Sequence, residues 1–352
     1  FAVAVVGRVA GGLAAASIMA MGIFAAMSGS GPATTAAVGS IMIPAMDKQG
    51  YKGGYAEGVA AVGGGLGIVI PPSIPLILIA LQLQISIPRL FLAGFLPGLV
   101  IAVALLATNY ILSHRRGYRG ADRDPEDART YTQSVSQAAW AGKWALMAPV
   151  IILGSIYSGL VTITEASVIA VLYALFVGIV VYRELNFPVF ARALRTTVQV
   201  VGVIVILLTA GTAFAQLIAW HGLPALVLEW MTALDANMYV LAFIMVLLLV
   251  VVGMFMETIA QIFIFAPIFF PIMVAAGMDP LTYAIVFIIG CQIGFDTPPL
   301  GANLFIVAEL GNNRFEDIVA VAVRFVVAEV IAMLIVAYVP FFTTWLPALV
   351  MG

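Results

Sequence analysis

The chain has 352 residues, of which 63% are hydrophobic and only 9% are charged, and its mean hydropathy is +1.15. A soluble domain carries about 25% charged residues, so this composition excludes an ordinary soluble protein and indicates a multi-pass membrane protein. The single cysteine, Cys291, excludes an intramolecular disulfide. No metalloprotease, phosphate-loop or Ser-His-Asp motif is present, so nothing in the sequence favours an enzyme or a nucleic-acid-binding protein.

The N-terminal third predicts a re-entrant hairpin followed by a broken span. A crossing helix needs about 20 apolar residues, and the runs at 11–26 and 36–46 are shorter, with a small, polar tip at 28–35 between them. Segment 55–83 is long enough to cross, but four glycines and three prolines fall within 63–75. Proline removes a backbone donor, and in hydrocarbon every freed backbone group needs a partner. We therefore expect a helix break that lines a polar cavity.

The rest of the chain predicts further spans and a second hairpin with its own broken span. The second hairpin has arms at 238–255 and 259–275 around a polar tip at 256–261, and the second broken span, 281–310, has its break at 290–301. The remaining predicted elements are spans at 90–112, 144–159, 166–182 and 197–219, a polar stretch at 113–143, an interfacial connector at 183–195, an amphipathic segment at 223–234 and a last span ending near 340.

The distribution of basic residues supports this order. With the ends of the first hairpin in the cytoplasm, Arg89 alone falls outside. The other 14 of the 15 Lys and Arg residues lie on or near the cytoplasmic side: Arg8, Lys48, Lys52, Arg115, Arg116, Arg119, Arg123, Arg129, Lys143, Arg183, Arg192, Arg195, Arg314 and Arg324. The second hairpin then opens to the outer side, so the two hairpins enter the membrane from opposite faces.

The two hairpin regions also form an internal repeat. A shift of 227 residues aligns 30–79 with 257–306 without a gap, with eleven identities in fifty positions. The matched pairs include Pro44 with Pro271 and the Pro-Pro pair at 71–72 with that at 298–299. Because the copies have opposite orientation, we interpret them as an inverted repeat, which is typical of secondary transporters.

A hairpin tip beside a helix break brings free backbone groups and half-helix ends together. Carbonyls and half-helix C-termini suit a dehydrated cation such as Na⁺, and half-helix N-termini suit a carboxylate. The predicted first site combines Ser28, Gly29, Ser30 and Thr34 with backbone near Gly65, Gly67 and Pro71. The second combines Glu257, Thr258 and Gln261 with Gly294, Asp296, Thr297 and Asn303. Glu257 and Asp296 could instead be helix caps in a water-filled crevice, and the small residues could serve close helix packing.

Two further acids have open interpretations. Glu165, at an outer turn, is more simply a helix cap than a ligand. Glu329 could pair with Arg324 or face a subunit boundary.

Specific motifs lie at the tips, breaks and turns: Gly11-Gly12-Leu13, Ser28-Gly-Ser-Gly-Pro-Ala-Thr34, Gly39-Ser-Ile-Met-Ile-Pro44, Met46-Asp-Lys-Gln-Gly-Tyr51, Gly67-Ile-Val-Ile-Pro-Pro-Ser73, Thr162-Ile-Thr-Glu-Ala166, Pro267-Ile-Phe-Phe-Pro271, Gly277-Met-Asp-Pro280 and Thr297-Pro-Pro-Leu-Gly301. In combination they make essentially the whole chain resemble the large membrane subunit, the M or DctM-like subunit, of TRAP (tripartite ATP-independent periplasmic) transporters. The first tip has Ser-Gly where the family more often has Ser-Ser, and Glu257 stands where Asp is common. The family's N-terminal helices are missing, so we expect the natural N-terminus to lie upstream.

The resemblance implies an all-α fold of the ion-transporter superfamily and a sodium-driven elevator in the bacterial inner membrane. It implies two partners, a small four-helix membrane subunit (Q type) and a periplasmic substrate-binding protein (P type), with a small carboxylate such as a dicarboxylate or a sialic acid as substrate. Transport-domain repeats would occupy 11–83 and 237–310. Scaffold would occupy 84–236, with the cytoplasmic loop 113–143 and the interfacial arm 183–195, and also 311–352.

With this resemblance, we assign Na⁺ to Ser28, Gly29, Ser30, Gly67, Pro71, Glu257, Thr258, Gly294 and Thr297. We assign the substrate to Ser30, Thr34, Ser73, Asp296, Thr297 and Asn303. The alternatives are a stand-alone carrier of the same superfamily, perhaps driven by protons, and a channel in which the breaks form a filter. Two hairpins of opposite orientation argue against a channel, because a pore needs no alternating access.

Overall fold

The computed structural model describes all residues except 121–130, 223–228, 230–236 and 300. Every regular element in that part of the chain is a helix, as predicted. The chain forms two compact units, one of residues 129–212 with Phe1 and a larger one of residues 2–128 and 213–352.

The smaller unit contains α7 (Tyr131–Ala141), α8 (Lys143–Tyr157), α9 (Ile163–Phe176) and most of α10 (Phe187–Trp220). α8 packs against α9, which continues into a π-helical turn at Val177–Val181. The separate connector expected at 183–195 is wrong as an element, because from Phe187 it is one 34-residue helix with the following span. Alternation of Phe187, Val189 and Phe190 with arginines fits one face of that helix as well as it fits a separate interfacial piece.

The larger unit begins with a short helix, α1 (Ala2–Val6). Its first half then holds α2 (Gly12–Ser28), α3 (Gly31–Lys48), α4 (Tyr55–Val69), α5 (Ile74–Leu83) and α6 (Ile87–Arg116). Its second half holds α12 (Met238–Gly253), α13 (Thr258–Ala275), α14 (Pro280–Phe295), α15 (Ala302–Leu310), α16 (Phe315–Tyr338) and α17 (Phe341–Met351).

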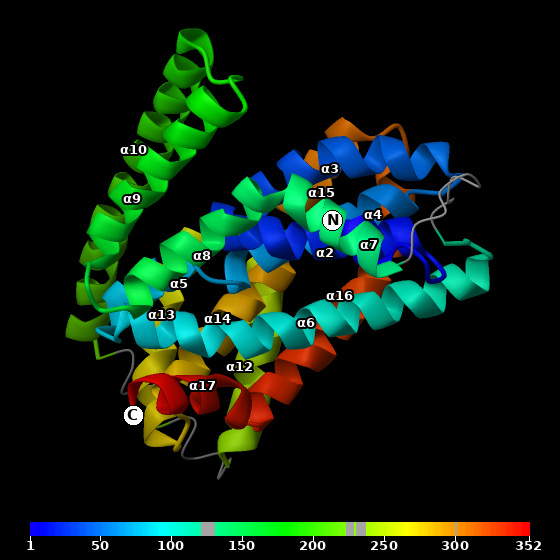
Figure 1. The fold of residues 1–352 in the computed structure, drawn as a ribbon. Helices are drawn as coiled ribbons and strands as arrows, with labels where there is room; N and C mark the ends of the chain where they lie inside the picture. The colour runs from blue at the N-terminus through cyan, green and yellow to red at the C-terminus, as the bar shows by residue number, and fades with distance from the viewer. Residues whose placement is uncertain (121–130, 223–228, 230–236, 300) are drawn as a thin grey trace. The chain divides into compact units, whose positions relative to one another are not determined.

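The predicted repeat appears in these helices. A shift of 227 residues carries both ends of α3 onto both ends of α13, and it carries the start of α6 to one residue before α16. The packing is reciprocal: α5 lies against α13, and its equivalent α15 lies against α3 (Figure 1). Each broken span therefore packs its second half on the hairpin of the other copy.

The two broken spans form the centre of the larger unit. Every residue of α4 is buried, as are nearly all of those of α14, and α4 packs against α14. A helix that is apolar all round is one that is buried. The breaks therefore lie in the interior of this unit.

Five described helices are long and apolar enough to cross a membrane, or up to seven if each bent pair counts as one span. One bent pair is α4 with α5, which meet at 41°. α13, with 18 residues, passes this length test, but its first residue, Thr258, directly follows a tip that packs beside the second break, so it starts near mid-span rather than at a membrane surface.

Both breaks are shorter than predicted. The glycines of 63–67 and residues 290–295 are helical, and only 70–73 and 296–301 interrupt the two helices. The tips are shorter too, because α3 already starts at Gly31 and α13 at Thr258. Proline forces a break, whereas glycine only lowers helix propensity by about 1 kcal/mol, and packing offsets that loss here.

Other predictions have mixed outcomes. The polar stretch at 113–143 contains the end of α6 and all of α7, while its centre, with Arg123 and Arg129, lies outside the described residues. The amphipathic segment at 223–234 also lies outside them apart from Glu229. The compact units cut across the predicted domain boundaries, since α6, α16 and α17 pack within the larger unit. Their assignment to a static scaffold concerns motion and stays a prediction.

Candidate functional site

The first tip is a two-residue turn between α2 and α3. Gly29 ends α2 in a left-handed conformation (φ 61°), and Ser30 is extended and caps α3. Ser28 Oγ and Thr34 Oγ1 are 2.7 Å apart, and Thr34 Oγ1 donates to the carbonyl of Ser30 at 2.8 Å. Two hydroxyls and one carbonyl thus converge at the tip.

This tip packs directly against the first break. The amide of Ile74 donates to the carbonyl of Gly29 at 3.1 Å. A Cβ on Gly67 would lie 2.5 Å from the carbonyl oxygen of Ser30 and 2.6 Å from Thr34 Oγ1. The structure therefore brings together the tip and break residues that the sequence grouped, and only glycine fits at position 67.

The two remaining residues of the predicted first set are at the break itself. Pro71 is buried and lies beside Gly94 of α6, and its bond to Pro72 is cis, like that between Pro298 and Pro299. Ser73 is buried, donates to the carbonyl of Ile68 and caps α5. The hydroxyl of Ser73 therefore bridges the two halves of the broken helix.

The second tip is capped by a carboxylate. Glu257 Oε2 accepts from the amides of Ile259 at 2.8 Å and Ala260 at 3.4 Å, which is the helix-cap role that the sequence left open. Thr258 and Gln261 follow in the first turn of α13, both buried. Gln261 Nε2 donates to the carbonyl of Met256 at 2.9 Å. The carboxylate thus sits on the N-terminal, positive end of α13.

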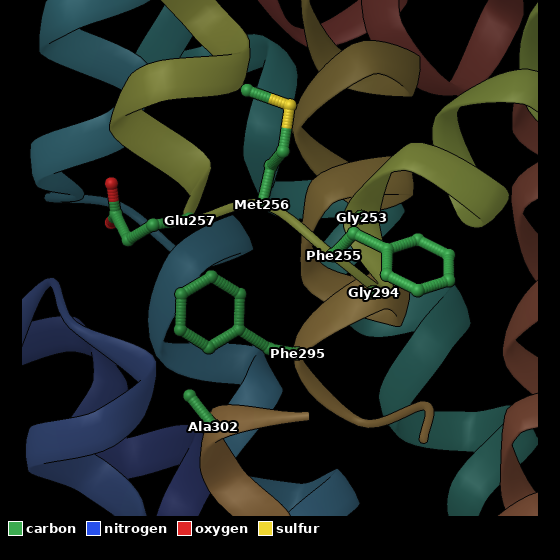
Figure 2. Close-up of a pocket in the computed structure, with 7 residues that line it drawn as sticks. All are labelled: Gly253, Phe255, Met256, Glu257, Gly294, Phe295 and Ala302. Carbon is green, nitrogen blue, oxygen red and sulfur yellow. The ribbon is translucent and has the colours of Figure 1, made fainter. Parts of the chain in front are cut away.

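A cavity of about 290 Å³ lies where the second tip meets the second break. Figure 2 shows its lining, which comes from the tip and from both sides of the break: Gly253, Phe255, Met256, Glu257, Gly294, Phe295 and Ala302. A Cβ on Gly294 would lie 2.4 Å from the backbone of Gly253, so α12 and α14 touch here without side chains.

This cavity is bordered by helix ends of both polarities. α12 and α14 end at it with their negative C-termini, and α13 and α15 begin at it with their positive N-termini. Such an arrangement can bind a cation and an anion close together. The N-terminus of α13 already has a carboxylate, Glu257, whereas α15 begins after Gly301 without a side-chain cap.

The chain matches, over residues 1–342, the family described as "Tripartite ATP-independent periplasmic transporter, DctM component". The chain belongs to the DctM family. This family is one of transporter permeases, and the several apolar helices make this member a multi-pass membrane protein.

Curated relatives agree with this membership of the DctM family. The chain is 37% identical over 334 residues to the isethionate TRAP transporter permease protein DctMQ of Oleidesulfovibrio alaskensis, matching 95% of this chain and about half (52%) of that protein. It is 34% identical to the C4-dicarboxylate TRAP transporter large permease protein DctM of Pseudomonas aeruginosa, over 99% of this chain and 80% of the relative. It is also 34% identical to the sialic acid TRAP transporter large permease protein SiaM of Vibrio cholerae, over 100% and 81%.

One solved structure shares the fold of this DctM-family chain. The YdaH transporter of Alcanivorax borkumensis has a TM-score of 0.53 and 15% identity, covering 92% of this chain and 84% of YdaH. At that identity the likeness concerns the fold alone.

The remaining predicted residues of this DctM-family chain lie around the second break. Thr297 Oγ1 donates back to the carbonyl of Ile293 at 2.6 Å. Asp296 and Asn303 are fully buried and bond to each other, with 2.8 Å between Asn303 Nδ2 and Asp296 Oδ1. The roles of these residues as ion or substrate ligands stay predictions.

Sequence reasoning missed two polar residues of this region. Gln292 was not singled out, and Glu329 was considered only as a partner of Arg324 or at a subunit boundary. Glu329 is fully buried and bonds Gln292, while Arg324 is exposed on the same helix. The signal was present, because a polar residue inside an apolar helix marks a functional site by default.

Proposed function

We propose that this chain is the large membrane subunit of a sodium-coupled TRAP importer, which moves a small organic anion of the carboxylate class by an elevator mechanism. The observation that carries the proposal is the reciprocal packing of two tips and two breaks in a duplicated unit. Such a unit places a binding site between two equivalent halves, which is the design of alternating-access carriers.

The first tip fits Na⁺ in its donor chemistry. Its polar groups are the hydroxyls of Ser28 and Thr34 and the carbonyl of Ser30, all oxygen and all uncharged. A hard cation prefers oxygen ligands, and the adjoining C-terminal end of α2 adds a negative partial charge. With Gly29, Gly67 and Pro71, these groups would hold one Na⁺. Glu257, Thr258, Gly294 and Thr297 would hold another at the second tip.

The substrate would lie between the tips, with its anionic group at uncapped or hydroxyl-capped helix N-termini. Ser30 and Ser73 cap two such ends, and Ala302 begins a third beside the 290 Å³ cavity. Relatives are named for C4-dicarboxylates, sialic acid and isethionate. Isethionate carries a sulfonate, so the feature these substrates share is a compact anion, which a helix N-terminus can bind.

The proposal includes two partners and a place in the cell. A small four-helix membrane subunit would extend the scaffold, and a periplasmic binding protein would deliver the substrate across the outer face of the bacterial inner membrane. The relative named DctMQ carries both letters in one permease, about twice the length that this chain spans. The nearly complete exposure of α9 and α10 in the structure supports apolar neighbours for these helices, lipid or protein.

The test is uptake into proteoliposomes that contain the intact transporter, with its binding protein outside. We expect saturable uptake of a radiolabelled organic acid that requires both an inward Na⁺ gradient and the binding protein. Uptake driven equally by a pH gradient without Na⁺, or without the binding protein, would favour the stand-alone, proton-driven carrier. Unsaturated, Na⁺-independent flux would favour a channel.

Two alanine variants test the tips within this assay. Ser30→Ala and Thr297→Ala remove one hydroxyl each, and we expect the Na⁺ concentration for half-maximal uptake to rise several-fold while the amount of folded protein is unchanged. Ser40→Ala is the matched control, because its hydroxyl lies on α3 but is exposed and bonds only the carbonyl of Ala37. Wild-type Na⁺ dependence in both tip variants would remove this site assignment.

A further inference from the structure

Four polar side chains lie together inside the larger unit, away from solvent. Gln292 and Asp296 are on α14, Asn303 is on α15 and Glu329 is on α16, and each is 0% exposed. They approach α4 at Gly65, where a Cβ would lie 2.4 Å from Gln292 Nε2 and 2.6 Å from Asp296 Oδ2. This polar cluster has no counterpart among the sites that the sequence predicted.

One amide nitrogen joins the two carboxylates of the cluster. Gln292 Nε2 donates to Asp296 Oδ2 at 2.9 Å and to Glu329 Oε1 at 2.7 Å. Asn303 Nδ2 donates to Asp296 Oδ1 at 2.8 Å and to the carbonyl of Ala61 at 3.3 Å. Both oxygens of Asp296 thus have donors, but Glu329 has a donor at one oxygen only.

Three buried oxygens of the cluster have no hydrogen-bond partner. They are Glu329 Oε2, Gln292 Oε1 and Asn303 Oδ1. No basic side chain is among the partners that the described residues provide for either carboxylate. An unpaired buried charge costs several kcal/mol, and an unsatisfied buried acceptor about 1–3 kcal/mol. The arrangement therefore lacks a positive group.

The repeat shows that the fold does not require this polarity. The shift of 227 residues relates the four members of the cluster to Gly65, Val69, Leu76 and Ala102 in the first copy, which are all apolar or small. The first copy builds the same helices with those residues. The equivalent positions Gly65 and Gln292 lie against each other, so the glycine leaves the space that the glutamine of the other copy fills.

We infer that the Gln292–Asp296–Asn303–Glu329 cluster is a binding site for one dehydrated monovalent cation of the Na⁺ class, separate from the two tips. The inference rests on the proposed function only in that Na⁺ is the cation which that function supplies. Glu329 provides the charge and its free oxygen Oε2, and Asp296 provides a second carboxylate whose two donors hold it in place.

Gln292 gives the site a means of opening. Its NH₂ group lies between the two carboxylates, where a cation would be. Half a turn of the terminal amide exchanges Nε2 for Oε1, so that three oxygens, from Gln292, Asp296 and Glu329, face a common point. Oxygen-only coordination of this kind suits a hard cation and not a soft metal.

The experiment measures equilibrium ²²Na⁺ binding to the intact transporter in lipid nanodiscs, with Glu329→Gln as the variant. Glutamine keeps the size of the side chain and removes its charge, and we expect one fewer Na⁺ bound per transporter, or at least a tenfold loss of affinity at one site. Glu316→Gln is the matched control, since it removes a carboxylate from the same helix at an exposed position. Gln292→Leu, which removes the amide, should produce the same loss.

The outcomes separate this inference from the proposed function. Wild-type Na⁺ stoichiometry and affinity in Glu329→Gln, with folding confirmed by size-exclusion chromatography, would overturn the cation site even if uptake requires Na⁺. A loss of pH-dependent thermal stabilisation in that variant, with Na⁺ binding unchanged, would overturn it in favour of a proton site. Uptake that needs no Na⁺ in the wild type would instead contradict the proposed function.

Discussion

Each of the glycines between residues 63 and 67 lies against a different neighbour. A Cβ at Gly63 would meet Met21, one at Gly64 would meet Thr35, and one at Gly65 would meet Gln292, all within 2.7 Å. Gly67 faces the carbonyl of Ser30 and the hydroxyl of Thr34. These glycines therefore act through the absence of a side chain, since their helix runs unbroken to Val69.

The substitution Gly67→Ala tests this at the first tip. The added methyl group would force the tip away from the break, and overpacking of this kind costs about 1–3 kcal/mol. We expect a lower thermal unfolding midpoint and a several-fold weaker Na⁺-dependent stabilisation of the purified transporter. Fluorescence-monitored unfolding at a series of Na⁺ concentrations measures both.

The control for this substitution is Gly22→Ala on α2. A Cβ there would meet only the side chains of Leu66 and Ile70, at 3.7 Å, which is ordinary van der Waals contact. We expect little change in stability or in the effect of Na⁺. Equal effects of the two substitutions would mean that tip packing does not govern ion binding.

At the scale of the element, α9 shows a carboxylate whose role is structural. Thr162 and Glu165 form a capping box, in which Glu165 Oε2 accepts from the amide of Thr162 at 2.7 Å and from its hydroxyl at 2.9 Å. The sequence interpretation of Glu165 as a cap is thus confirmed. The pattern predicts this because both partners lie within one turn.

The substitution Thr162→Ala removes one half of the box. Loss of an N-cap costs about 1 kcal/mol, so the first amides of α9 should exchange with solvent about fivefold faster, while Na⁺-dependent uptake is unchanged. Hydrogen–deuterium exchange mass spectrometry measures the first effect. Thr197→Ala, inside α10 with its hydroxyl on the carbonyl of Ala193, is the control. Altered Na⁺ dependence without faster exchange would give this turn a functional role.

The same distinction explains what the sequence could predict of the fold and the site. Caps, proline breaks and the 227-residue repeat depend on neighbours or on fixed spacing, so the sequence alone predicts them. The helical course of residues 63–67 depends on contacts with α2, α3 and α14, which are distant in the chain. Glu329 lies 37 residues from Gln292, and no local pattern links them, so the polar cluster was missed.

At the scale of the whole molecule, the repeat implies that equivalent loops lie on opposite sides of the membrane. Gln49 ends α3 and Ala276 ends α13, and the shift of 227 residues relates these two positions. The basic residues Lys48 and Lys52 flank the first position, whereas no Lys or Arg lies near the second in the sequence. The positive-inside rule therefore places Gln49 in the cytoplasm and Ala276 outside.

Single cysteines at these two positions test the orientation. Cys291, the one native cysteine, is fully buried and should not react, so the unmodified protein is the blank. In intact spheroplasts, a membrane-impermeant maleimide should label Ala276→Cys and spare Gln49→Cys. After permeabilisation it should label both, because Gln49 is exposed and Ala276 is partly exposed. Labelling of both in intact spheroplasts would place the hairpins on one face. Two hairpins entering from one face would not form an inverted pair around a shared site, and the alternating access that an elevator requires would lose its structural basis.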